Sequence, residues 1–323
     1  MGAVSCHSSG TPVSTTQKTV PLRLLGRTGV RVSILGVGGS HLAKRGKLGE
    51  DESIELVRSA IDNGINFMDN CWDYNDGQSE ERMGKALRDG YRQRAFLMTK
   101  LDGRTATAAR EQLLQSMARL QTNVIDLVQV HEVIRQSDPE RVFSTDGAIH
   151  TLVEARQAGA IRFIGFTGHK DPSIHLAMLE RAKLSGFGFD TVQLPLNVMD
   201  AHYRSFEHMV LPVLLERGIG VLGMKSMGSG DILESGIVSP EECLRYALSL
   251  PTSVVITGID NQRILAQSLR IARQFTPLKP NERKTLLERT AVLAQSGKYE
   301  QFKTGEKYDG TVQNPRWLDT AQI

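Results

Sequence analysis

The chain has 323 residues, of which 40% are hydrophobic, and its 39 lysines and arginines nearly balance 36 aspartates and glutamates. A formal net charge of +3 without a basic block argues against nucleic acid or an anionic membrane as a partner. Three cysteines without a CxxC motif argue against structural zinc and iron–sulfur clusters, so no metal is expected. No apolar run approaches the roughly 20 residues of a membrane span. The odd cysteine count fits a reducing compartment, and we expect a cytoplasmic protein.

The first 20 residues are rich in serine and threonine and lack the apolar centre of a secretory signal. Cys6 stands where a myristoylation motif requires serine or threonine. Such a segment buries too little apolar surface to offset the entropy that it would lose on ordering. We therefore expect residues 1–20 to form a flexible tail.

Past this tail, short apolar runs alternate with amphipathic stretches. A hairpin is predicted around the turn GRTG at residues 26–29, where it would plug the N-terminal end of a barrel. Eight later runs are almost continuously hydrophobic, as expected for parallel strands that are covered on both faces. They are residues 32–37 (VSILGV), 65–69 (INFMD), 95–100 (AFLMTK), 125–131 (IDLVQVH), 162–168 (RFIGFTG), 190–197 (DTVQLPLN), 220–225 (GVLGMK) and 254–258 (VVITG).

Between these runs, apolar residues recur at helical spacing over residues 51–64, 105–121, 148–160, 205–220 and 239–250. Eight strand–helix units in series predict an α/β fold of the (β/α)₈ TIM-barrel type over residues 21–280. Residues 281–323 are predicted to form a helical extension and tail that pack on the barrel. The alternative is a doubly wound sheet, which normally carries a GxGxxG turn after its first strand. The turn GVGGSHLAKRG does not match it.

Four polar residues fall at the predicted strand ends, where barrels carry their chemistry. Asp69 ends the second strand, Tyr74 follows in its loop, Lys100 ends the third strand and His131 ends the fourth. A nearby ammonium lowers the pKa of a phenol, and a neutral imidazole can polarise a carbonyl oxygen. Each residue alone also has an ordinary structural explanation as a cap, a packing residue or a solvated charge. Together they suit delivery of a proton to an oxygen whose carbon receives a hydride from a cofactor.

The segment GINFMDNCWDY with EERMGKAL, and the segments FLMTK and DLVQVH, are similar to motifs of the aldo-keto reductase family, with resemblance over residues 22–268. The resemblance implies NAD(P)H-dependent reduction of a small-molecule aldehyde or ketone. It implies that Tyr74 is the general acid, that Lys100 lowers the pKa of Tyr74, that Asp69 pairs with Lys100, and that His131 orients the carbonyl group.

The same resemblance implies a cofactor site at the barrel mouth. Gln193 would bind the carboxamide, Met224 would lie under the nicotinamide ring, and Lys225 would meet the pyrophosphate. Arg263 would meet the 2′-phosphate, which favours NADPH over NADH, although NAD is a possible cofactor too. The full predicted set is Asp69, Thr167, Gln193, Met224, Lys225, Ser226, Gly228, Gly258, Arg263 and Gln267.

The chain departs from the family pattern at several places, among them Met224 where many members carry an aromatic residue and Gln267-Ser268 where the family has Glu-Asn. Asn70 and Cys71 follow Asp69 where the family often has Thr-Ala, and Cys71 is either a reactive thiol or a small packing residue. Thr167 and Gly168 stand where the family often has Ser-Asn, so the hydrogen bonds of the asparagine are either missing or supplied by His169.

Two other functions stay open at this point. Relatives of this fold serve as cofactor-sensing regulatory subunits with weak catalysis. A barrel of this type can also be a Schiff-base aldolase with Lys100 or Lys225 as the nucleophile. The individual carbonyl substrate and the oligomeric state are not specified by the sequence.

Overall fold

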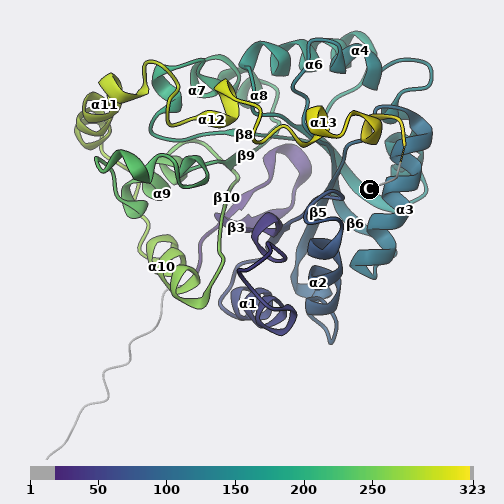
Figure 1. Cartoon of the computed structure of the whole chain (residues 1–323), viewed down its shortest axis with the longest axis horizontal. Coiled ribbons are helices and arrows are strands. Elements are labelled where there is room, and N and C mark those ends of the chain that lie inside the picture. Colours follow the sequence, from purple (N-terminus) through teal and green to yellow (C-terminus); the bar gives the residue numbers. More distant parts are fainter. Residues whose placement is uncertain (1–18, 321–323) are drawn as a thin grey trace, which may run out of the picture.

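A closed barrel of eight parallel strands forms the centre of the computed structural model, which describes residues 19–320 (Figure 1). The strand β10 pairs with both β9 and β3, and this pairing closes the ring. All eight predicted strands are present. They are β3 (Leu35–Gly38), β4 (Phe67–Asp69), β5 (Phe96–Leu101), β6 (Ile125–Val130), β7 (Ile161–Thr167), β8 (Thr191–Pro195), β9 (Gly220–Met224) and β10 (Val254–Thr257).

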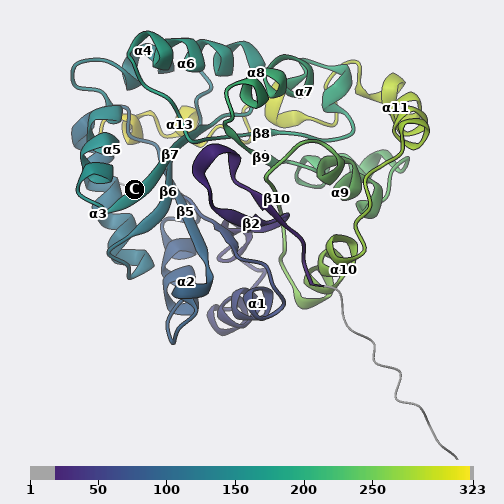
Figure 2. The same ribbon diagram turned by 180° about the vertical axis from the view of Figure 1, so that it is seen from behind.

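Helices surround the strands and cover their outer faces (Figures 1 and 2). The helix predicted over residues 205–220 is instead two short helices, α7 and α8, because Pro212 has no N–H group to donate. The helices are α1 (Glu50–Asp62), α2 (Gln78–Ala86), α3 (Ala106–Leu120), α4 (Asp138–Val142), α5 (Ala148–Gln157), α6 (Pro172–Leu184), α7 (Phe206–Met209), α8 (Leu211–Glu216), α9 (Pro240–Ser249), α10 (Gln262–Arg273), α11 (Pro280–Ala294), α12 (Gln301–Thr304) and α13 (Gly310–Gln313).

The predicted hairpin is formed by β1 (Leu22–Leu24) and β2 (Arg31–Ser33) and lies across one end of the barrel (Figure 2). Leu25 and Val32 are fully buried with side chains of the barrel strands, so the hairpin closes that end. At Gly26 a Cβ atom would lie 2.3 Å from the backbone nitrogen of Gly220, so only glycine fits this contact. The run 32–37 was predicted as one strand, but its first two residues belong to the hairpin.

The described chain continues after α10 through α11 and then crosses the other end of the barrel. There α12 and α13 (yellow) lie in front of the strands, opposite the hairpin (Figure 1). Within residues 19–320 no helix is both long and apolar enough to cross a membrane. The predicted tail, residues 1–20, lies outside the described residues except for Thr19 and Val20, and Val20 is buried. The division into a barrel over 21–280 and an extension over 281–323 stays a prediction.

Candidate active site

The structure brings the four predicted catalytic residues together at one mouth of the barrel. Asp69 is the last residue of β4, Lys100 lies in β5, and His131 directly follows β6. The Lys100 ammonium donates hydrogen bonds to the carboxylate of Asp69 and to the hydroxyl oxygen of Tyr74, the latter over 3.2 Å. The rings of Tyr74 and His131 meet edge to face, with their centroids 6.0 Å apart. The predicted pairing of Asp69 with Lys100 is present.

Burial is the largest influence on Tyr74 and raises its pKa well above the usual range, while the Lys100 ammonium lowers it. Lys100 therefore acts in the predicted direction, but desolvation of the phenolate outweighs it. Burial lowers the pKa of Lys100, but the Asp69 carboxylate raises it, and the net pKa lies above the usual range. At neutral pH the site thus holds a neutral phenol beside a charged ammonium, which is the state that a proton donor requires.

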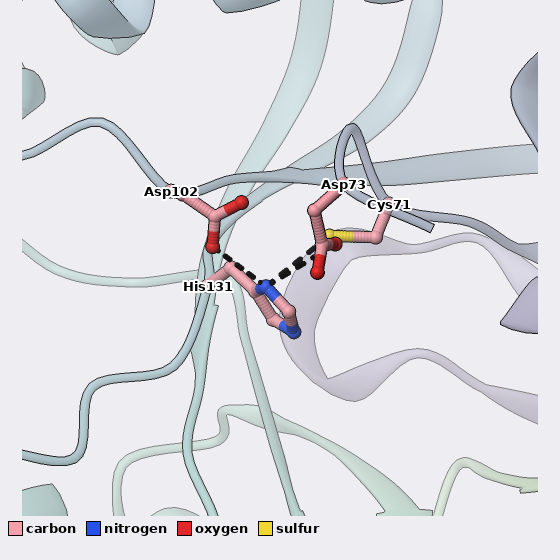
Figure 3. A group of neighbouring side chains, drawn as sticks. All are labelled: Cys71, Asp73, Asp102 and His131. Atoms are coloured by element: carbon pink, nitrogen blue, oxygen red, sulfur yellow. Dashed lines mark hydrogen bonds and ion pairs between the residues drawn. The ribbon is translucent and has the colours of Figure 1, made fainter. Parts of the chain in front are cut away.

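A second group of side chains packs behind His131 (Figure 3). Of its members Asp102, Cys71 and Asp73, only Cys71 was singled out from the sequence. The Nδ1 atom of His131 lies 2.9 Å from Oδ1 of Asp102, 3.2 Å from Sγ of Cys71 and 3.7 Å from Oδ1 of Asp73. Burial raises the pKa of Asp73 to about 7 and that of Asp102 to about 8. Burial also raises the pKa of Cys71 well above the usual range, so Cys71 is a packed, protonated thiol.

Two cavities meet at Tyr74 and Met224. The first has a volume of about 240 Å³ and continues toward the loop before α10. Of the predicted cofactor residues, it is lined by Asp69, Gln193, Met224, Lys225, Ser226 and Gly258. The second has a volume of about 470 Å³ and reaches Lys100 and His131, with Thr167 in its wall. Gly228, Arg263 and Gln267 are absent from the lining of both cavities as the structure describes them.

Gln193 has the buried polar group that a nicotinamide carboxamide requires. Its side-chain nitrogen donates to Oδ2 of Asp69 over 3.2 Å. Its side-chain oxygen is buried and has no hydrogen-bond partner among the described residues. Because an unsatisfied buried acceptor costs about 1–3 kcal/mol, a donor from a ligand is favoured at this position. The first cavity therefore fits a nicotinamide group.

Lys225 stands between the two cavities in a left-handed backbone conformation, with φ of 57°. Its ammonium donates to Ser229 over 3.0 Å and lies 4.2 Å from the ring centroid of Tyr308. Burial lowers the pKa of Lys225 to about 8. A desolvated cation beside a cavity binds a phosphate strongly, because little water must be removed from it.

The segment after α11 is fastened over the mouth by two carboxyl groups, a contact that the sequence did not predict. Glu132 accepts hydrogen bonds from the backbone of Gly310 (2.9 Å) and from the backbone and hydroxyl of Thr311 (2.8 and 2.7 Å). Asp309 contacts Nε2 of His169 at 2.9 Å. Since Nε2 of His169 is engaged by Asp309, that nitrogen does not replace the asparagine that the family often carries.

Comparisons with known proteins agree with this geometry. The model of the Aldo/keto reductase family matches residues 34–237. L-galactose dehydrogenase of Arabidopsis thaliana is 31% identical over 229 residues, which cover 67% of this chain and 68% of that protein. Aldo-keto reductase YhdN of Bacillus subtilis is 34% identical over 216 residues, which cover 63% of this chain and 61% of that protein. The holo form of aldo-keto reductase AKR11C1 from Bacillus halodurans shares the fold, with a TM-score of 0.68 at 23% identity over 84% of this chain and 96% of that one.

Proposed function

Because this chain belongs to the aldo/keto reductase family of oxidoreductases, which use nicotinamide cofactors, we propose that it reduces an aldehyde or ketone to an alcohol with NADPH. The observation that carries the proposal is the contact of 3.2 Å between the Lys100 ammonium and the Tyr74 hydroxyl. This contact lies where the two cavities meet, so a cofactor in one and a substrate in the other share the same phenol.

The cofactor supplies the hydride when it is bound. Gln193 would hold its carboxamide, Met224 would contact its ring, and Lys225 with Ser226 would meet its pyrophosphate. The two cavities share Tyr74, Met224 and Lys225 in their walls, so groups bound in them would lie side by side.

Tyr74 gives its hydroxyl proton to the substrate oxygen as negative charge develops there. The Lys100 ammonium stabilises the phenolate that forms when Tyr74 loses its proton. Two acceptors hold Lys100 in place: the carboxylate of Asp69 and the carbonyl oxygen of Asn70, which lies 2.7 Å from Nζ. His131 lines the second cavity and polarises the substrate carbonyl.

Substitution of Tyr74 by phenylalanine tests the acid role. General acid catalysis contributes about 10²- to 10⁴-fold, so kcat/KM is expected to fall by a factor in that range. Binding of NADPH, followed by fluorescence titration, is expected to be retained because the ring and its packing are unchanged. Unchanged turnover of Tyr74→Phe would remove the assigned role.

The preference for NADPH over NADH is supported by the charge of Arg263 in the first turn of α10, next to Ile264, which lines the first cavity. Asp260 lines the same cavity and favours the ribose hydroxyl of NADH instead, since it repels a phosphate. Parallel titrations with both cofactors decide between these charges. Tighter binding of NADPH that Arg263→Ala abolishes supports the proposal, and equal binding of the two cofactors contradicts it.

The wall of the second cavity favours a hydroxylated or charged carbonyl substrate. Met224 and Gly310 are the members of its lining without a hydrogen-bonding side chain, and Lys44, Asn75 and Lys307 surround its outer part. An apolar ketone would leave the polar groups of the inner wall, such as Tyr74 and His131, without a ligand partner. We expect a higher kcat/KM for a polyhydroxy aldehyde than for the aliphatic aldehyde of equal chain length. The reverse order would contradict this substrate class.

A Schiff-base aldolase stays the second candidate, and the lowered pKa of Lys225 favours it because an amine must be neutral to attack a carbonyl. Lys100 does not suit this role, since its pKa is raised. Borohydride reduction in the presence of a carbonyl substrate separates the two functions. A covalent adduct that Lys225→Met abolishes would support the aldolase, and absence of an adduct together with NADPH consumption would support the reductase.

A further inference from the structure

Only one ring nitrogen of His131, Nδ1, contacts the side chains that pack on the side of the ring away from the cavity. Its Nδ1 atom faces Asp102, Cys71 and Asp73, whereas the other ring nitrogen points away from all three (Figure 3). His131 also lines the second cavity. The atom that contacts Asp102 is therefore not the atom that is available to a substrate.

The proton on Nδ1 decides what Nε2 can do. If Asp102 is a carboxylate, Nδ1 must carry the ring proton to form the bond of 2.9 Å, and Nε2 of a neutral ring is only an acceptor. Such a ring cannot donate a hydrogen bond to a carbonyl oxygen. If Asp102 carries a proton, it donates to Nδ1, and the ring proton is fixed on Nε2.

The surroundings of Asp102 offer little to an ionised carboxyl group. Asp102 is fully buried, and its second oxygen, Oδ2, has no hydrogen-bond partner among the described residues. The nearest guanidinium, that of Arg104, donates to Asp138 and to three backbone carbonyl oxygens rather than to the Asp102 carboxyl group. The Cys71 thiol donates to the carbonyl oxygen of Lys100 over 3.6 Å. A buried charge with one hydrogen bond is costly, whereas a protonated acid with one acceptor is satisfied.

Charged groups from three strand ends act on this position. The loop after β4 contributes Asp73, and the end of β6 contributes Glu132. Burial is the largest cause that raises the pKa of Asp102, and the Glu132 carboxylate raises it further, whereas Arg104, Lys100 and Arg135 lower it. The charge of Asp102 in turn raises the pKa of Asp73. The pKa of Asp102, about 8, reflects this balance and agrees with the geometry.

We propose that Asp102 is a positioning residue whose protonated carboxyl group donates a hydrogen bond to Nδ1 of His131, so that Nε2–H is presented to the substrate oxygen. The step transfers no electrons, and the proton of Asp102 stays shared between Oδ1 and Nδ1. This role rests on the proposed reduction for its use, but the tautomer of His131 is a property of the free protein. The Asp102 carboxyl group thus sets whether His131 is a donor or an acceptor.

The test is ¹⁵N NMR of histidine-labelled full-length protein, with His131 assigned from a His131→Asn sample. We expect the Nε2–H tautomer at pH 7 and conversion to the Nδ1–H tautomer as pH rises through about 8. The value of kcat/KM is expected to fall over the same pH range. An Nδ1–H tautomer at pH 7, or a tautomer that does not change up to pH 10, would overturn the proposal.

Two variants separate positioning from packing. Asp102→Leu removes the donor and keeps the volume, so both tautomers are expected and kcat/KM is expected to fall about 10- to 100-fold with little change in cofactor binding. Asp102→Asn keeps an N–H donor that does not titrate, so it is expected to restore activity and to lose the pH-linked change of tautomer. Loss of activity in Asp102→Asn with an unchanged tautomer would also overturn the proposal.

The NMR measurement tests the role of Asp102, and the kinetic measurement tests the proposed function, so either claim can be contradicted without the other. The predicted tautomer in a protein that does not reduce carbonyl compounds would contradict the proposed function alone. The opposite tautomer in an active reductase would contradict the role of Asp102 alone. Asp89→Asn, which neutralises an exposed carboxylate, is the matched control and is expected to change neither measurement.

Discussion

Arg104 joins the ends of two strands at the base of the active site. Its buried guanidinium donates to the carbonyl oxygens of Asp102, His131 and Glu132 at 2.7, 2.8 and 2.8 Å, and to the carboxylate of Asp138 at 2.9 Å. The planar fork of arginine suits such a set, because one rigid group satisfies several acceptors at once. The backbone of three site residues is therefore held by one side chain.

Substitution of Arg104 by methionine is expected to lower the free energy of unfolding by about 3–5 kcal/mol, because it removes the buried partner of Asp138 and leaves only Arg135, 3.9 Å away, to face that charge. Urea denaturation measures the change. The control is Arg110→Ala, since Arg110 pairs with Glu154 at the surface and such pairs contribute only about 0–1 kcal/mol. Equal stabilities of the two variants would contradict this account of Arg104.

At the scale of elements, α13 is attached to the barrel by the carboxylate of Glu132. This residue directly follows His131 and has a positive φ of 45°, so the chain turns sharply after the catalytic position. Because both oxygens of Glu132 accept hydrogen bonds from Gly310 or Thr311, the attachment depends on a group with two acceptor atoms.

Glu132→Gln replaces one of these acceptor oxygens by an NH₂ group. This group cannot accept a hydrogen bond from the N–H or O–H donors that it would face. We expect faster hydrogen exchange in residues 301–318 and a higher KM, because these residues contribute part of the second cavity. Glu140→Gln in α4, whose carboxylate pairs at the surface with Arg181, is expected to leave both quantities unchanged. Unaltered exchange in Glu132→Gln would show that other contacts hold α13.

The strands were predictable because parallel strands under helices have a strong local signal in their apolar runs. Residues 32–33 were wrongly assigned to the first barrel strand, because a hairpin that packs into a barrel is as apolar as the barrel strand that follows it. Pro212 indicates the break between α7 and α8, but the apolar residues around it recur at helical spacing and favoured a single helix.

The positions of Asp69, Lys100 and His131 were predictable because parallel strands end at one mouth of a barrel. The contact between Asp102 and His131 was not, because it depends on the register that sets Leu101 beside Val130. An acid after a strand has no local feature that separates a buried hydrogen bond from a solvated charge. The attachment of Thr311 to Glu132 joins residues far apart in the chain, and the sequence near either one does not indicate the other.

At the scale of the whole molecule, the barrel closes between β3 and β10, and the wall of the active site is completed by residues that follow both. A ribosome releases β3 early and residues 301–318 late. The ring therefore cannot close before β10 has emerged, and the attachment to Glu132 cannot form before Thr311 has emerged. A nascent chain halted before Tyr308 would leave Glu132 without its hydrogen bonds from Gly310 and Thr311, and Lys225 without the ring of Tyr308. Closure of the ring and completion of the second cavity thus both depend on segments that leave the ribosome long after β3.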